Sequence, residues 1–133
     1  MAALQVLAAR PKRAIRLTRN SKLFKTIITA IRQKKGENIV SLDLRNIEEA
    51  VADFFIICEA SSTVQIKAIA DAVDHEVKLQ TGELPYHREG YQGLQWVLID
   101  YVNIVVHIFQ PEARRFYKLE EMWSDGGVTE HEA

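Results

Sequence analysis

Apolar residues recur at helical spacing in two stretches of the chain, which predicts two amphipathic helices. The first stretch begins at Ser21, a candidate N-cap, ends at Gly36, and places on one face Leu23, Phe24, Ile27, Ile28 and Ile31. The second begins at Ser62, which with Gln65 matches a capping box, ends at Gly82, and places on one face Ile66, Ile69, Ala70, Val73 and Val77.

Other apolar segments are shorter and indicate strands. Residues 38–44 form one candidate. Residues 53–58 form a second, and because their apolar side chains do not alternate with polar ones, we expect this strand to be central and covered on both faces. Residues 95–101 and 104–109 are separated only by Val102 and Asn103, which predicts a β-hairpin, and a further strand is expected near Leu84.

Pro111 fits the first turn of a last helix, in which Phe116, Leu119 and Met122 or Trp123 share a face before the glycines at 126 and 127. The order of elements predicts one α/β (α+β) domain, with a mixed β-sheet packed by helices. We divide the chain into a basic N-terminal extension at 1–20, the domain at 21–125 and a C-terminal tail at 126–133.

The predicted hairpin has two faces of different character. If Val102 and Asn103 form a two-residue turn, strand parity places on one face Val97, Ile99, Tyr101, Ile104, Val106 and Ile108. The other face holds Trp96, Leu98, Asp100, Val105, His107 and Phe109. The first face is core. The second mixes large apolar groups with a carboxylate and an imidazole, as protein-binding surfaces do; the alternative is that a helix covers it and His107 is a core histidine.

Charge is distributed unevenly along the chain. Residues 1–36 contain ten Lys or Arg and no acid, whereas residues 37–133 contain 18 acids and seven bases. The basic extension at 1–20 resembles in composition a transit peptide, an RNA-contacting tail or a solvated extension. No apolar run approaches the length of a membrane span, and the single cysteine, Cys58, excludes a disulfide framework.

The sequence offers little for catalysis. Asp100 and His107 would lie diagonally on one hairpin face, but no nucleophile accompanies them. Asp43 and Asp53 fall on adjacent strands, as in a nucleotidyltransferase-like metal site, without the glycine-serine turn and paired aspartates of such sites. His75, His87 and His131 lack the spacing of a zinc site. We therefore expect no enzyme activity, no metal and no cofactor.

Six segments resemble, in order and spacing, the ribosomal silencing factor (Iojap-like) family. They are ADFFII at 52–57, QIKAIAD at 65–71, EG at 89–90, WVLIDY at 96–101, VVHIF at 105–109 and RRFYKLEEMW at 114–123. The resemblance spans about residues 21–125. It departs from the family pattern at 102–103, where Val-Asn replaces the usual Gly-Asp, at 59–60, where Glu-Ala replaces Thr-Gly, and at Val64, where the family has Arg.

The resemblance implies a fold with nucleotidyltransferase-like topology and a translational repressor without known catalysis, often homodimeric when free. Such proteins bind the large ribosomal subunit through universal large-subunit ribosomal protein fourteen and block subunit joining. The residues that the resemblance and the hairpin face together suggest for this contact are Trp96, Leu98, Asp100, Tyr101, Asn103, His107 and Tyr117.

Several alternatives stay open at this point. The chain could be an assembly factor of the large subunit or, less in keeping with its motifs, a nucleotidyltransferase-like enzyme. The extension at 1–20 could contact ribosomal RNA. We expect a bacterial cytoplasmic protein, or an organellar one if that extension is a transit peptide, and no membrane association.

Overall fold

The computed structural model describes residues 21–123 and 126–132. Its elements follow one another in the order α2 (Lys22–Gln33), β1 (Glu37–Asp43), β2 (Phe54–Glu59), α3 (Thr63–Thr81), β3 (His87–Glu89), β4 (Trp96–Asp100), β5 (Ile104–Phe109), α4 (Pro111–Tyr117), α5 (Leu119–Met122) and β6 (Gly127–His131). The predicted α/β class is confirmed, and the predicted extension at 1–20 lies outside the described residues.

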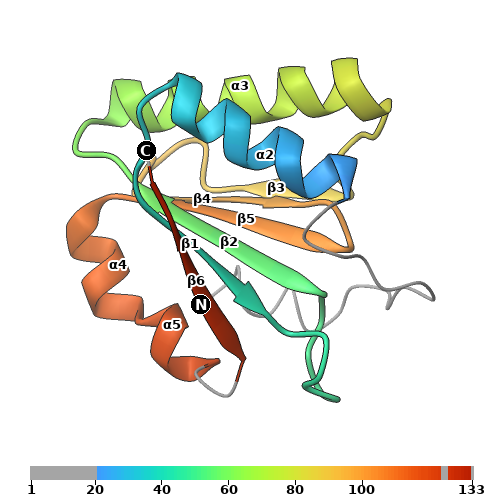
Figure 1. Ribbon diagram of the computed structural model, residues 1–133. Coiled ribbons are helices and arrows are strands. Elements are labelled where there is room, and N and C mark those ends of the chain that lie inside the picture. The colour runs from blue at the N-terminus through green and yellow to red at the C-terminus, as the bar shows by residue number, and fades with distance from the viewer. Residues whose placement is uncertain (1–20, 124–125, 133) are drawn as a thin grey trace.

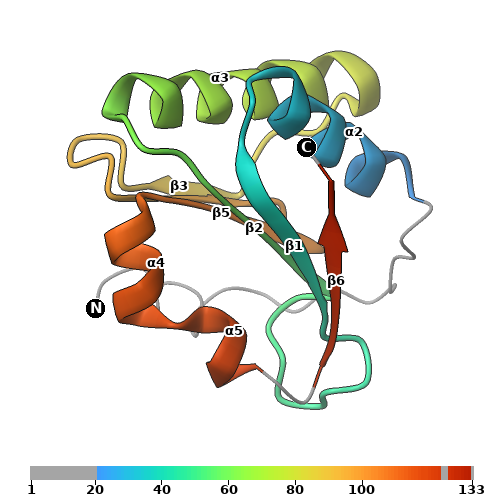
Figure 2. The same cartoon turned by 60° about the vertical axis from the view of Figure 1, so that its left-hand side comes forward.

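All six strands belong to one mixed sheet, in the order β3-β4-β5-β2-β1-β6. β2 and β5 are parallel, and the other neighbours are antiparallel. As Figures 1 and 2 show, α2 and α3 cover one face of this sheet, and α4 and α5 lie on the other. We call these the α2–α3 face and the α4–α5 face. β2 is central and buried, as its unalternated apolar sequence predicts.

The two long helices begin where the sequence predicts; α3 also ends at the predicted glycine, whereas α2 ends at Gln33, three residues before Gly36. The Ser21 hydroxyl accepts a hydrogen bond from the backbone N–H of Phe24, and the Ser62 hydroxyl accepts one from that of Gln65. α3 ends at Gly82, whose φ of +76° is the left-handed conformation that favours glycine at this position. The capping box is only half formed, because the Gln65 side chain instead donates to the carbonyls of Lys34 and Lys35. It thereby joins the start of α3 to the end of α2.

Each face of the sheet carries its own hydrophobic core. On the α2–α3 face, residues of both helices pack on alternating side chains of the strands, among them Phe54, Ile56, Val97, Ile99 and Val106. On the α4–α5 face the core comprises Val40, Leu42, Leu44, Ala52, Phe55, Ile57, Trp96, Leu98, Val105, Phe109 and Leu119. The loop between β1 and β2 packs on this second core through Ile47, Ala50 and Val51. The sheet is thus the middle of three layers.

The hairpin has the predicted register. Trp96 pairs with Phe109, Leu98 with His107, and Ile99 with Val106. The turn is tight: Tyr101 N donates to Ile104 O at 2.8 Å, and Asn103 N donates to Tyr101 O at 2.8 Å. The second bond closes a γ-turn around Val102, whose φ is +71°. A β-branched residue is strained in this conformation, which explains why a family pattern would place glycine there.

Two expectations for the end of the chain are wrong. The last helix is not continuous, because Lys118 adopts φ +50° and separates α4 from α5, so Phe116 does not share a buried face with Leu119. Residues 127–131 are not a tail. They form β6, which pairs antiparallel with β1 from Ile39 opposite His131 to Asp43 opposite Gly127. Among the described residues, no helix combines the length and hydropathy that crossing a membrane requires.

Candidate functional site

The hairpin face that the sequence analysis interprets as a docking surface is buried. Leu98, Asp100 and His107 are fully shielded from solvent, and Trp96 is 6% exposed. The alternative considered above, in which this face is covered and His107 is a core histidine, is therefore the correct one. α4, α5 and the β1–β2 loop pack on the core that contains Trp96 and Leu98. In the folded chain, Leu98, Asp100 and His107 cannot touch a partner directly.

His107 is held by its neighbour on the adjacent strand. The Trp96 indole N–H donates a hydrogen bond to His107 Nδ1 at 3.0 Å, which leaves the imidazole proton on Nε2 in the neutral ring. The ring also packs against Phe55, with centroids 4.6 Å apart. Burial without a compensating charge lowers the pKa of His107 to about 3. The imidazole is therefore neutral at physiological pH and serves as a structural acceptor for Trp96.

Trp96 connects this buried cluster to the molecular surface through ring contacts. Its indole stacks on Phe109 at 4.9 Å and meets the Tyr117 ring of α4 at 4.8 Å. Tyr117 in turn contacts Phe116 edge to face at 4.9 Å. Tyr117 is partly buried, whereas Phe116 is 77% exposed. An aromatic side chain this exposed, backed by two further rings, has the composition of an interface anchor. We call Phe116, Tyr117 and Trp96 the aromatic edge.

The remaining predicted residues lie at the other end of the hairpin. Asp100 Oδ1 accepts a hydrogen bond from Val102 N at 2.8 Å, so this buried carboxylate shapes the turn rather than pairing with His107. The Asn103 carbonyl accepts from Asp53 N and Phe54 N, which ties the turn to β2. Tyr101 packs in the core of the α2–α3 face. Five residue steps separate Trp96 from Tyr101, where the turn begins, about 16–17 Å along a strand. The structure thus does not gather all the predicted residues at one place.

Arg114 is a feature that the sequence analysis missed. Its side chain, 9% exposed, is the one residue of α4 classed as buried. The guanidinium donates to Asn38 O at 2.7 Å, to Glu59 Oε1 at 2.9 Å and to Glu120 Oε2 at 3.3 Å. The sequence contains a signal for the burial of Arg114, because it precedes Tyr117 by three residues. A helix that turns Tyr117 toward the sheet therefore places Arg114 on the same face.

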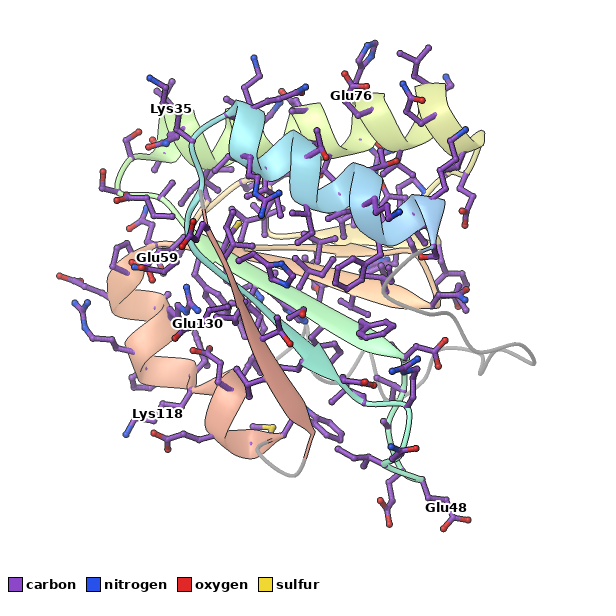
Figure 3. All side chains as sticks on the ribbon, viewed as in Figure 1. Lys35, Glu48, Glu59, Glu76, Lys118 and Glu130 are labelled. Carbon is purple, nitrogen blue, oxygen red and sulfur yellow. The ribbon has the colours of Figure 1, made fainter. Side chains whose placement is uncertain are left out.

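Beside Arg114 an open groove of about 990 Å³ runs between α4–α5 and the β1–β6 edge. Figure 3 labels three of its lining residues, Glu59, Glu130 and Lys118. The carboxylates that line it are Glu37, Glu59, Glu120, Glu121, Glu130 and Glu132, against the bases Arg114, Arg115 and Lys118. The groove is therefore acidic overall, in keeping with the acidic composition of residues 37–133.

The groups considered for catalysis have structural partners or are inaccessible. Asp43 accepts two hydrogen bonds from the Arg45 guanidinium, at 2.9 and 2.6 Å, so its charge is compensated without a metal. Cys58 is completely buried, and burial raises the pKa of its thiol to about 12. Within the part of the chain that the structure describes, no three His, Cys, Asp or Glu side chains gather as a metal site would require.

Comparisons with known proteins agree with the resemblance. The family model described as "Ribosomal silencing factor during starvation" matches residues 18–133. A ribosomal silencing factor of Halalkalibacterium halodurans is 37% identical over 113 residues, which cover 85% of this chain and 95% of that protein. A crystal structure of a protein from Chromobacterium violaceum superposes with a TM-score of 0.73 at 30% identity, covering 77% of this chain and 84% of that one.

A more distant relative comes from an organelle. The mouse protein named "Mitochondrial assembly of ribosomal large subunit protein 1" is 27% identical over 100 residues, which cover 74% of this chain and 43% of that protein. The family model covers far more than half of the sequence, and the bacterial relatives match it over most of their length. The chain therefore belongs to the ribosomal silencing factor family.

Proposed function

We propose that this chain is a non-catalytic repressor of translation, which binds the large ribosomal subunit through universal large-subunit ribosomal protein fourteen and so blocks subunit joining. Family membership supports this role. The observation that carries the location of the contact is the 77% exposure of Phe116, next to Tyr117 and Trp96. Trp96 and Tyr117, which the resemblance suggests for the contact, lie here beside an exposed aromatic side chain. Aromatic side chains are enriched in binding hot spots.

The predicted contact residues divide by role in this proposal. Tyr117 and Asn103 are partly exposed and are available to a partner, together with the exposed Phe116. Trp96 supports Tyr117 from behind through the ring contact at 4.8 Å. Leu98, Asp100, Tyr101 and His107 are buried and would act only by holding the hairpin. The acidic groove next to α4 adds a charge that complements a basic ribosomal-protein surface and would raise the association rate.

The test uses the full chain with purified large and small subunits. Phe116→Ala should weaken co-sedimentation with the large subunit by about tenfold or more, because a truncated hot-spot aromatic costs roughly 1.4 kcal/mol or more. Val64→Ala is the matched control, since Val64 is 79% exposed but lies on α3, across the sheet. Large subunits preincubated with the wild-type chain should form fewer joined ribosomes on a sucrose gradient. Equal co-sedimentation of both variants and wild type would remove the aromatic edge from the contact.

Pull-down with isolated ribosomal protein fourteen identifies the partner. Capture by the wild-type chain and by Val64→Ala, with reduced capture by Phe116→Ala, is the expected result. A chain that sediments with whole large subunits yet fails to capture this protein would assign the contact to another component of the subunit.

The name of the mouse relative favours a second function, assembly of the large subunit. An assembly factor should sediment with immature large-subunit particles, and its depletion should make such particles accumulate. A silencing factor should instead sediment with mature subunits, and its depletion should leave their number unchanged.

The proposal also covers features that the resemblance implies for this chain. We expect a homodimer of the free protein, which native mass measurement tests. Residues 1–20 lie outside the described residues. For them two roles are proposed, contact with ribosomal RNA and action as a transit peptide. Depending on that segment, the chain acts in the bacterial cytoplasm or in an organelle.

A further inference from the structure

The helix that carries Phe116 and Tyr117 is attached to the sheet through a buried charged side chain. α4 has only seven residues, too few for a helix to be stable without tertiary contacts. Short helices are normally held by a buried apolar stripe. In α4 the apolar residues that touch the core, Ala113 and Tyr117, are only partly buried, and the residue classed as buried is Arg114. The most buried side chain that attaches α4 to the sheet is therefore a charged one.

The contacts of Arg114 reach three separate elements. Through Asn38 O at 2.7 Å it reaches β1, and through Glu59 Oε1 at 2.9 Å it reaches the end of β2. Through Glu120 Oε2 at 3.3 Å it reaches α5. Charge-assisted hydrogen bonds of this kind are roughly twice as strong as neutral ones, and the flat guanidinium fixes the direction of each. We call Arg114, Glu59 and Glu120 the arginine clamp.

The clamp also spans the bend between the two short helices. Lys118, at φ +50°, lies between Arg114 and Glu120 in sequence, and its backbone N–H donates to Arg114 O at 3.0 Å. The bond from Arg114 to Glu120 therefore links α4 to α5 across this bend. Phe116 and Tyr117 lie within this bridged segment. The orientation of the Phe116 and Tyr117 side chains relative to Trp96 therefore depends on the position of α4, which the arginine clamp helps to fix.

We propose that Arg114 is a positioning residue for partner docking: held by Glu59 and Glu120, it fixes α4 on the sheet so that Phe116 and Tyr117 face the partner. This inference rests on the proposed function and adds the residue that sets the geometry of its contact. A protein partner binds a preorganised surface more tightly than a mobile one, because less conformational entropy is lost on association. Loss of the clamp should therefore weaken docking even where the folded core persists.

The test compares Arg114→Met with Arg115→Met in the full chain. Arg115 is the neighbouring, exposed arginine of the same helix, so the control removes the same charge from α4. Amide hydrogen exchange should become at least tenfold faster over residues 111–117 in Arg114→Met alone, while β4 and β5 keep their protection. In Arg114→Met carrying Trp123→Phe, so that only Trp96 emits, fluorescence should shift to longer wavelength as Tyr117 moves away. Co-sedimentation with large subunits should weaken about tenfold or more.

Glu59→Gln is a second variant, which leaves α4 itself unaltered and keeps an acceptor oxygen without its charge. In this variant amide exchange over 111–117 should become faster and docking weaker, as in Arg114→Met, but by a smaller factor. This variant keeps the proposal testable if Arg114→Met loses protection throughout β4 and β5 and is therefore unfolded.

Two results would overturn the inference. One is unchanged exchange over 111–117 in both clamp variants. The other is faster exchange there with wild-type docking, which would leave Arg114 a structural role only. Failure of the proposed function looks different, because the wild-type chain itself would not sediment with large subunits while the exchange difference between Arg114→Met and Arg115→Met remained.

Discussion

Replacing Val102 with glycine should stabilise the fold, which is uncommon for a valine-to-glycine change. Val102 has φ +71° at the centre of the hairpin γ-turn. A left-handed conformation costs an L-residue about 1–2 kcal/mol, and glycine adopts it without that cost. Against this gain, glycine increases the conformational entropy of the unfolded chain by about 0.4–1 kcal/mol. Because Val102 is only partly buried, little apolar contact is lost. The net expectation is a gain of about 0–1.6 kcal/mol, with a central value of about 0.8 kcal/mol.

Urea unfolding followed by tryptophan fluorescence measures this gain, and Tm should rise by roughly 2–5 °C. Val128→Gly provides the control, because Val128 is 53% exposed on β6 and its φ is not positive. There the same change should destabilise by about 0.5–1 kcal/mol. If Val102→Gly destabilised the chain as much as Val128→Gly does, the strain argued for the turn would not exist.

Three further predictions concern His107, Gly90 and Cys58. The pKa of His107 is about 3 in the folded chain and ordinarily 6.5. The free energy of unfolding should therefore hold its full value above pH 6.5 and fall as the pH drops toward 3, by up to about 1.4 kcal/mol per pH unit. Acid unfolding curves of wild type and His107→Gln should diverge below pH 6.5. Gly90 has φ +92°, and a Cβ there would overlap the Trp96 carbonyl oxygen, so Gly90→Ala should cost about 3 kcal/mol in urea unfolding. Cys58 should react with a thiol reagent only on unfolding, at a rate that follows urea concentration.

Local patterns predicted the elements whose signals are local. Ser21 and Ser62 mark helix starts through side-chain bonds three residues on, and Gly82 marks an end through its backbone conformation. The hairpin register followed from strand parity and a two-residue turn, and it is confirmed from Trp96 to Asp100. Such signals lie within a few residues of the element they define, so a single sequence contains them.

What the sequence did not reveal depends on packing between distant segments. The second hairpin face was interpreted as open because Asp100 and His107 are polar, yet both are buried, where Val102 N donates to Asp100 and the Trp96 indole N–H donates to His107 Nδ1. The rule that unalternated strands are covered on both faces, applied correctly to β2, holds equally for β4 and β5, whose residues are all buried. β6 is short and largely polar, and only its pairing with β1 makes it a strand.

The pairing of β6 with β1 also has a consequence for synthesis of the chain. Ile39 pairs with His131, so the outer side of β1 is completed by residues that are synthesised long after β1 itself. Until then β1 has a neighbour only on the β2 side, and its outer backbone groups are open to other strands. A nascent chain halted before residue 127 would therefore expose an unpaired edge to neighbouring nascent chains. β6 then replaces β1 as the edge of the sheet, and because it is only five residues long and largely polar, it is a poorer template for pairing with another chain.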